Sequence, residues 1–320
     1  MPKIVFFNHY HRGDLFTNRG YVVAVKDALK HFEFGYLHFN HPKLTRDISI
    51  KYEGEPTAFG RKERFRFENG CLYINTWMGA YKRSMIKFGG LNMSAMHEQW
   101  SIIFDEINKQ FDTNLHLSSK KTRYLPNIDP TFLSLNNIDE YLKKSSNNKK
   151  IIFCNGAPKS LQSFQYDMSN QINQLAIEHP NIHFICTARI QTDRPNVLFT
   201  DDIIKDTEEE SKRAPWEDRN QNICDLLEIS YLSEHCDLIV GKNSGPFCFC
   251  ETGRNYLDTK KSFLSFNVSW GMGTLESESM SYDLPLSCKY HRVAISAVEN
   301  LPDSDMKAIY DNLKHLIIQL

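Results

Sequence analysis

The sequence predicts an α/β protein built from two successive domains. Short, almost purely apolar runs alternate with segments in which apolar residues recur every three or four positions, as buried parallel strands and amphipathic helices do. The length of 320 residues suits about two domains, and the alternation restarts after a polar stretch at residues 143–150. We therefore expect one domain over residues 1–145 and a second over residues 146–320. A solvated loop inside a single domain is the alternative reading of the polar stretch.

The individual elements follow from these patterns in chain order. The expected strands are residues 4–8, 34–39, 72–76, 150–155, 182–187, 197–199, 237–240 and 261–267. The expected helices are one that ends near residue 32, then residues 100–111, 135–142, 163–179, 223–235, 246–254 and 303–320. The pair Asn69-Gly70 predicts a turn before the strand at residues 72–76. The closing helix could return to pack on the first domain.

Composition and cysteine spacing limit the partners and the compartment. A formal net charge of −1 argues against a nucleic-acid binder, which usually carries a basic surplus. No run approaches about 18 consecutive apolar residues, and the N-terminal residues lack the features of a signal peptide. We therefore expect no membrane span, which leaves peripheral membrane association open. The eight cysteines show no metal-binding spacing, so we expect free thiols in a reducing cytoplasm.

The most specific stretch is residues 225–246, in which an apolar helix, a buried strand and a small polar turn lead into a new helix. Ser244 is a good helix cap, Gly245 lets a ligand approach the backbone, and Pro246 suits an early helical position. A helix N-terminus at the carboxyl end of a parallel strand attracts anions, and Lys242 adds a positive charge beside it. An ordinary capped helix without a ligand is the alternative.

This stretch resembles the GT-B glycosyltransferases, and in particular the heptosyltransferase-like family, glycosyltransferase family 9. In that family a Leu/Ile-rich helix and the string Asp-Leu-Ile-Val-Gly lead to an Asn-Asp-Ser-Gly-Pro turn that meets the sugar-nucleotide donor. Here the turn reads Lys242-Asn243-Ser244-Gly245-Pro246. Since Asn243 stands where the family usually has Asp, the family's donor sugar does not carry over. The resemblance implies two Rossmann-like domains facing a cleft, with the donor on the second.

The first domain offers a matching piece in Gly13-Asp14, between the first strand and the first helix. The resemblance implies that Asp14 is the general base for the acceptor hydroxyl. A carboxylate can act in this way when it is held near the hydroxyl and partly desolvated. A helix cap is the alternative reading of Asp14. His9 and His11 flank it and could contact the acceptor, replace Asp14 as the base, or ligate a metal with it.

Further candidate donor contacts follow the strands of the second domain. Asn155, Gly156 and Lys159 lie in a small-residue loop that suits a diphosphate. The spacing of a Walker loop is absent, and a plain turn is an equally good interpretation. Arg189 follows the next strand and could contact the base or a phosphate. Glu251 could accept hydrogen bonds from ribose hydroxyls.

Candidate acceptor contacts lie in the aromatic and polar loop that follows the strand at residues 72–76. Asn75, Trp77 and Tyr81 are the residues of this loop that suit a carbohydrate, because the C–H faces of sugars pack on aromatic rings. The alternative is that these side chains form an edge of the core.

These features predict an enzyme that transfers a sugar from a nucleotide-sugar donor to a hydroxyl acceptor such as a glycan or glycolipid. Asp14 is the expected base, and Lys242, Lys159 and the backbone of residues 244–245 would stabilise the leaving diphosphate. The resemblance implies no cofactor and no bound metal. Two alternatives stay open: a sugar-nucleotide epimerase or hydrolase on the same scaffold, and a noncatalytic nucleotide- or sugar-binding module.

Overall fold

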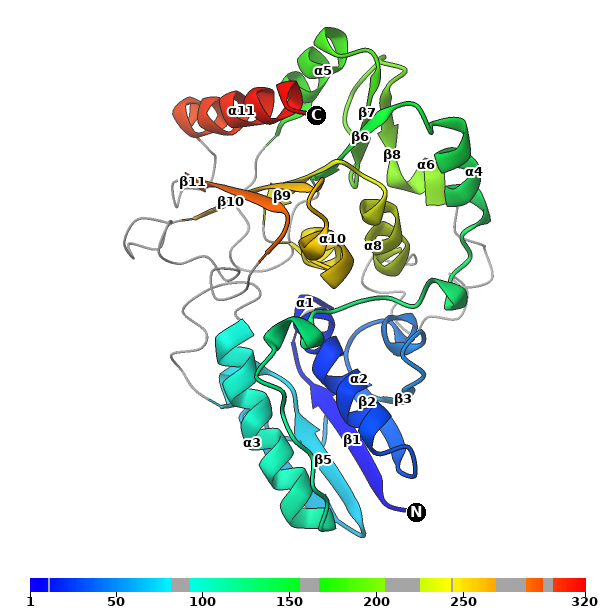
Figure 1. The fold of residues 1–320 in the computed structure, drawn as a ribbon, viewed down its shortest axis with the longest axis vertical. Helices are drawn as coiled ribbons and strands as arrows, with labels where there is room; N and C mark the ends of the chain where they lie inside the picture. Colours follow the sequence, from blue (N-terminus) through cyan, green and yellow to red (C-terminus); the bar gives the residue numbers. More distant parts are fainter. Residues whose placement is uncertain are drawn as a thin grey trace. The chain divides into compact units, whose positions relative to one another are not determined.

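The chain forms two compact units, one over Met1–Phe132 and one over most of the chain from Leu133 to Leu320. The computed structural model describes residues 1–10, 12–81, 93–155, 167–204, 225–242, 244–268, 286–295 and 302–320. Each unit is an α/β layer structure around its own sheet, coloured blue to cyan for the first and green to red for the second in Figure 1.

The division between the units falls after Phe132, earlier than the expected boundary at residue 145. The cause is helix α4 (Asn136–Lys144), which bonds to the second unit. Asn137 Nδ2 donates to the backbone oxygen of Ile204 at 3.3 Å, and the Tyr141 hydroxyl lies 2.9 Å from His183 Nδ1. Of the polar stretch at residues 143–150, only residues 145–148 form a loop, and this loop lies within the second unit.

The first unit has a five-stranded sheet in the order β3-β2-β1-β5-β4. Its elements are β1 (Lys3–Asn8), α1 (Arg12–Thr17), α2 (Arg19–Ala28), β2 (Glu33–His38), β3 (Lys51–Gly54), β4 (Phe65–Glu68), β5 (Cys71–Asn75) and α3 (Met93–Phe111), with short 3-10 helices at Pro42–Thr45, Met78–Ala80, Lys121–Tyr124 and Pro130–Phe132. All neighbouring strands are parallel except β4 and β5, which form an antiparallel pair.

The central strand β1 is buried on both faces. On one face Phe6 packs against Trp100 of α3, with the ring centroids 5.9 Å apart. On the other face Phe7 stacks on Phe59 at 4.6 Å. Because successive strand side chains point to opposite faces, this double burial explains why β1 is a continuous apolar run rather than an alternating one.

The structure departs from the expected elements of this unit in two places. The single helix expected to end near residue 32 is two helices, α1 and α2, which are divided at Asn18. The strands β3 and β4 were not predicted, because their side chains are largely polar and only partly buried. The turn before β5 is confirmed: Asn69 and Gly70 have φ values of 52° and 75°.

The second unit has a six-stranded, fully parallel sheet in the order β11-β10-β9-β6-β7-β8. Its remaining elements are β6 (Lys149–Cys154), α5 (Ser169–Glu178), β7 (Ile182–Cys186), β8 (Val197–Phe199), α6 (Thr200–Ile204), α8 (Leu226–Glu234), β9 (Leu238–Lys242), α9 (Gly245–Cys250), α10 (Gly253–Leu257), β10 (Ser262–Val268), β11 (Lys289–Ile295) and α11 (Asp303–Ile318). The sequence predicted every one of these strands except β11.

The closing helix α11 completes the core of the second unit. Ile309 and Leu313 share one buried cluster with Val293 and Ile295 of β11. The helix thus packs on its own unit's sheet, whereas the sequence left it free to return to the first domain. Within the described part of the chain, no helix combines the length and apolar character that crossing a bilayer requires.

Candidate functional site

The second sheet changes winding direction between β6 and β9, and this switch point carries the turn that the sequence singled out. From β6 the chain adds β7 and β8 on one side, then β9, β10 and β11 on the other. Ligands of doubly wound sheets bind beyond the carboxyl ends of the strands at such a point. Cys154 of β6 pairs with Gly241 of β9, so Lys242 and the turn after it lie at this edge.

Gly241 allows the helix after the turn to pack closely. A Cβ at this position would lie 2.7 Å from Cys154 Cβ and 2.9 Å from Phe247 Cδ2. Both distances are shorter than real Cβ contacts, so no other residue fits without a shift of strand β6 or helix α9. The close approach brings the N-terminus of α9 directly against the end of β6.

The turn itself has the capping geometry that the sequence predicts. Ser244 has extended backbone angles and its hydroxyl oxygen accepts a hydrogen bond from the backbone N–H of Phe247, while Pro246 occupies the first turn of α9. Among the described residues, no atom lies within 4 Å of a Cβ placed on Gly245. The described part of the chain therefore leaves space beside the turn. Asn243 lies outside the described residues.

Lys242 brings positive charge to the same edge. It is the last residue of β9 and is only 3% exposed. Burial disfavours the ammonium form and lowers the pKa of Lys242 to about 8. At neutral pH the side chain is still mostly charged.

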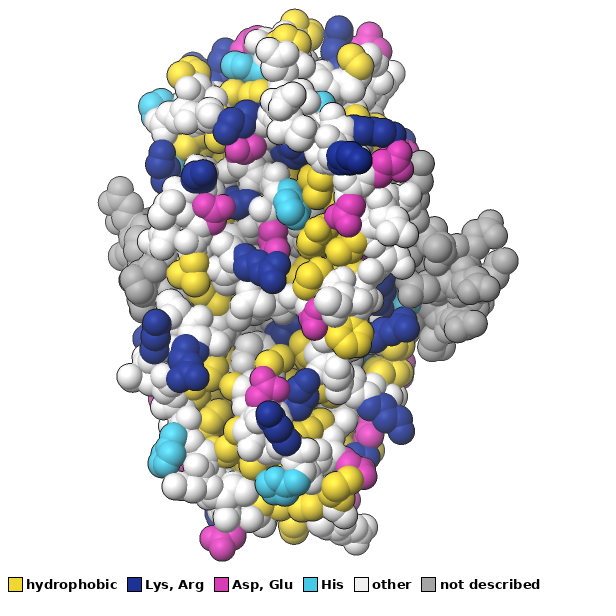
Figure 2. All heavy atoms as spheres, turned by 45° about the vertical axis from the view of Figure 1, so that its right-hand side comes forward, with side chains coloured by type: hydrophobic (Ala, Val, Ile, Leu, Met, Phe, Trp, Pro, Cys, Tyr) yellow, Lys and Arg dark blue, Asp and Glu magenta, His cyan; other side chains and the backbone are white. Residues whose placement is uncertain are grey.

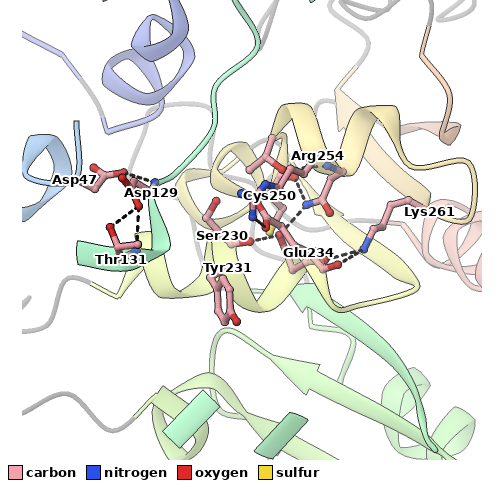
Figure 3. A network of polar contacts seen from close by, with 12 residues as sticks. Asp47, Asp129, Thr131, Ser230, Tyr231, Glu234, Cys250, Arg254 and Lys261 are labelled. Atoms are coloured by element: carbon pink, nitrogen blue, oxygen red, sulfur yellow. Dashed lines mark hydrogen bonds and ion pairs between the residues drawn. The ribbon is translucent and has the colours of Figure 1, made fainter. Parts of the chain in front are cut away.

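A buried polar network holds the far end of α9, and the sequence analysis did not identify it. Asn255 Nδ2 donates to Ser233 Oγ of α8 and to the backbone oxygen of Cys250, both at 2.8 Å. Lys261 Nζ donates to the backbone oxygen of Glu234 at 3.1 Å, and Figure 3 shows its side chain reaching toward the end of α8. Through Asn255 these contacts tie α10 to α8 and to the last residue of α9, and through Lys261 they tie α8 to the residue before β10.

Glu251 belongs to this interior rather than to an open site. It is 2% exposed, and the hydroxyl of Tyr290 on β11 donates to its Oε1 at 3.1 Å. Burial raises the pKa of Glu251, opposed by hydrogen bonds from Tyr256 and Tyr290. The helix expected over residues 246–254 is in fact two, α9 and α10, and Glu251 lies at their junction. Its carboxylate is thus engaged by the protein, which disfavours the expected ribose contact.

Asn155 and Arg189 meet beyond the ends of β6 and β7, but their side chains are occupied. Asn155 bonds with both its amide nitrogen and its oxygen to the backbone of Ala188, each at 2.9 Å. Arg189 is exposed and pairs with Asp201 at 2.8 Å and with Asp202 at 2.5 Å. Such exposed pairs contribute little to stability, yet they direct the guanidinium toward α6.

These residues border a pocket of about 580 Å³ in the second unit. It is lined by Asn155, residues 167–170 and residues 188–191, which come from the ends of β6 and β7 and the start of α5. Gly156 and Lys159, the other residues expected to contact a diphosphate here, lie outside the described residues.

Asp14 lies in the first unit, after the carboxyl end of β1. It is the third residue of α1 and half-buried, so it is not the cap that the alternative interpretation required. Asn18 anchors it: Asn18 Nδ2 donates to the backbone oxygen of Asp14 at 2.8 Å, and Trp100 Nε1 donates to Asn18 Oδ1 at 2.8 Å. His11, the second expected histidine of this loop, lies outside the described residues.

A buried polar cluster lies at the same end of the first sheet, and no sequence signal pointed to it. Thr76 Oγ1 accepts from Asn8 Nδ2 at 3.1 Å and lies 2.6 Å from the Tyr36 hydroxyl. Gln99 Nε2 donates to the backbone oxygen of Thr76 at 2.9 Å. Burial, and to a lesser extent the negative charge of Asp14, raises the pKa of Tyr36. The phenol therefore stays protonated near the candidate base.

His9 lies on the loop after β1. Burial and then the charge of Arg61 lower the pKa of His9. Its Nε2 atom is buried and has no hydrogen-bond partner among the residues that the structure describes. The ring contacts Phe7 and Phe39, each with centroids 5.9 Å apart.

Two of the three expected acceptor residues support the loop instead of facing a ligand. Asn75 is fully buried and its Nδ2 donates to the backbone oxygens of Arg61 and Glu63. Tyr81 is 4% exposed and its hydroxyl donates to the backbone oxygen of Asn75 at 2.7 Å. Trp77 is half-buried and its ring stacks on the ring of Tyr10. Nothing in the sequence marked Tyr10 as a candidate site residue.

No protein-family model and no curated protein sequence matches this chain. Solved structures similar to it include ADP-heptose LPS heptosyltransferase II of E. coli, at 11% identity and a TM-score of 0.48, covering 100% of this chain and 99% of that one. A family 9 glycosyl transferase of Veillonella parvula has 10% identity and a TM-score of 0.41, and the match covers 98% of this chain and 89% of that one. UDP-GlcNAc 2-epimerase of Neisseria meningitidis has 10% identity and a TM-score of 0.45, with 98% and 91% covered.

At these identities and TM-scores the likeness assigns no activity to this chain. Each of its two units is an α/β unit with its own largely parallel sheet, as the sequence predicted. The solved structures named above include both a heptosyltransferase and a UDP-GlcNAc 2-epimerase.

Proposed function

We propose that the chain is a GT-B type glycosyltransferase that moves a sugar from a nucleotide-sugar donor to a hydroxyl acceptor. The observation that carries the proposal is the turn after β9. There a buried lysine, a capped helix start and the space that the described residues leave beside Gly245 come together at the switch point of the second sheet. Phosphorylated ligands bind doubly wound sheets at such places, and the same residues resemble the donor turn of family 9.

The second unit would hold the donor and stabilise its leaving group. When the bond between the sugar and the diphosphate breaks, negative charge grows on the diphosphate. Lys242 and the backbone N–H groups at the start of α9 are the groups that would meet this charge. Because Lys242 is largely withdrawn from water, its attraction to a phosphate is stronger than that of a surface lysine.

The first unit would supply the base. Asp14 would take the proton of the acceptor hydroxyl while that oxygen forms its bond to the sugar carbon. The hydrogen bond from Asn18 to the backbone oxygen of Asp14 fixes the backbone that carries the base, and the side chain is half-buried. No step of this scheme is assigned to a metal.

One sequence observation favours a second candidate. Asn243 stands where family 9 usually has a carboxylate, and an amide cannot carry its charge. A noncatalytic module that binds nucleotide-sugars would tolerate this replacement.

Product analysis separates these functions. UDP- and ADP-linked sugars are incubated with the protein, with and without a panel of glycan acceptors, and followed by mass spectrometry. A transferase consumes donor and releases nucleoside diphosphate only when an acceptor is present. Consumption of donor alone would contradict transfer and indicate an epimerase or hydrolase. Donor binding without any turnover would indicate the module.

The same proposal places the protein in a reducing cytoplasm and gives it no nucleic-acid partner. The seven cysteines in the described residues are all free and buried, as reducing conditions favour. On the face drawn in Figure 2, basic and acidic side chains are mixed, whereas a nucleic-acid surface gathers Lys and Arg.

A further inference from the structure

The two strands that meet at the switch point of the first sheet end in the same way. Sheet order places β1 between β2 and β5, and the winding reverses between β1 and β5. Asn8 ends β1 and its Oδ1 accepts from the backbone N–H of Tyr10 at 2.8 Å. Asn75 ends β5 and its Oδ1 accepts from the backbone N–H of Trp77 at 2.9 Å. Each is a buried asparagine that holds, two residues later, an aromatic residue in an Asx turn.

The two aromatic rings positioned in this way stack on each other. The centroids of Tyr10 and Trp77 are 4.0 Å apart and the planes differ by 25°, so the two rings stack face to face. Gly79 supports the indole so closely that a Cβ there would come within 2.4 Å of Trp77 Cζ2. Both rings are half-buried, so the stack remains partly exposed.

A third contact fixes the loop of Tyr10 from the neighbouring strand. Asn40 Nδ2 donates to the backbone oxygen of Tyr10 at 3.1 Å, and the backbone N–H of Asn40 donates to Nδ1 of His38, the buried last residue of β2. The backbone of Tyr10 is therefore held on its nitrogen side by β1 and on its oxygen side by the loop after β2. A ring held so firmly loses little entropy when a ligand binds.

Positive charge lies over the same ring. The Arg61 guanidinium carbon is 6.0 Å from the Tyr10 centroid, and Arg61 is exposed. At this distance the guanidinium is near enough to reach polar groups of a ligand that lies on or beside the ring. Its planar donors can bond to hydroxyl, carboxylate or phosphate oxygens.

We propose that the stacked pair of Tyr10 and Trp77 is the platform for a pyranose ring of the acceptor, with Arg61 bonding to that ring's polar substituents. The inference rests on the proposed function and makes the acceptor a carbohydrate rather than a lipid or protein hydroxyl. The apolar C–H face of a pyranose packs on an aromatic ring while its hydroxyls stay available at the edges. The site lies where a doubly wound sheet receives ligands, and aromatic walls with few polar groups are typical of such sites.

Binding of free sugars tests the platform without any donor. Glucose, galactose, N-acetylglucosamine and glucuronic acid are titrated by saturation-transfer NMR against the full chain. Tyr10→Leu should weaken binding about fivefold or more, a change equivalent to about 1 kcal/mol. Tyr10→Phe keeps the ring and should stay within about twofold. The control is Tyr231→Leu, which alters a ring of α8 that packs on His235 in the other unit.

Arg61→Gln separates charge from stacking. It should weaken the binding of glucuronic acid more than the binding of glucose, whereas Tyr10→Leu should weaken the binding of both sugars. The proposal is overturned if none of the four sugars binds, or if Tyr10→Leu binds them as the parent does with an unchanged Tm.

Nucleoside diphosphates titrated into the same samples distinguish the two levels of the argument. Sugar binding without nucleotide binding would leave the platform standing and contradict the transferase. Nucleotide binding without sugar binding would contradict the platform and leave the transferase proposal standing.

Discussion

The two units share one winding plan but build their switch points differently. In the second unit, one continuous stretch of chain supplies the strand β9, the lysine, the cap and the helix α9. In the first unit, the polar groups come from β1, β2, β5 and α3, with Asn8 and Thr76 joined across 68 positions of sequence. A site made from residues that are neighbours in the sequence can thus be recognised as a sequence motif. A site whose residues are brought together by strand pairing has no such motif.

The largest expected effect concerns the base of the first unit. Asp14→Asn keeps the shape of the side chain, and the bond from Asn18 to the backbone oxygen of residue 14 is unaffected. Because an amide cannot accept the proton, kcat should fall about 10²–10⁴-fold, with donor affinity and Tm nearly unchanged. Steady-state kinetics, donor titration and thermal unfolding on one preparation measure all three.

The matched control for Asp14 is Asp27→Asn, an exposed carboxylate on α2. It should leave the rate unchanged. A rate for Asp14→Asn within about threefold of the parent would remove it from the mechanism. His9, whose Nε2 atom has no hydrogen-bond partner within the described part of the chain, would then be the next base to test.

The next largest effect concerns stability and depends on how closely α9 packs on β6 in the second unit. Gly241→Ala forces a Cβ to 2.7 Å from Cys154 Cβ, and should lower the free energy of unfolding by about 1–3 kcal/mol. Gly245→Ala, where a Cβ meets no atom of the described residues within 4 Å, should leave stability within about 0.5 kcal/mol. Chemical denaturation of both variants makes the comparison. Equal stabilities would mean that α9 does not pack on β6 as described.

An effect of similar size is expected in the first unit's buried cluster. Thr76→Val removes the hydroxyl that contacts Asn8 and Tyr36, and leaves buried polar atoms without a partner. The expected loss is about 1–3 kcal/mol in the free energy of unfolding. Thr57→Val, at an exposed position, should change it by less than about 0.5 kcal/mol. An unchanged stability in Thr76→Val would show that water replaces the lost contacts.

The smallest effect is a count of thiols. Denatured, nonreduced protein should titrate with all eight cysteine thiols of the sequence. In the described residues all but Cys71 lie in the second unit, and each is buried. A stable disulfide would contradict the reducing compartment.

The sequence predicted those parts of the fold and site that local chemistry determines. The apolar strands from β6 to β10 and the Ser244 cap belong here, because burial and capping act on adjacent residues. The break between α1 and α2 could not be predicted. At the break lies Asn18, whose partner Trp100 is 82 positions away. For the same reason Asn75 was taken for an acceptor contact, although its amide supports a loop that pairing of β4 and β5 creates.

The most direct test of the central claim is nucleotide binding at the turn after β9. Titration calorimetry with nucleoside diphosphates should show binding that Lys242→Met weakens several-fold or more, while Lys260→Met, at an exposed position, leaves it unchanged. Since the pKa of Lys242 is lowered to about 8, affinity in the parent should fall as pH rises through about 8, where the ammonium loses its proton. The Lys242→Met variant should lose this pH dependence. An affinity that neither the substitution nor the pH alters would contradict the assignment of the donor site to this turn.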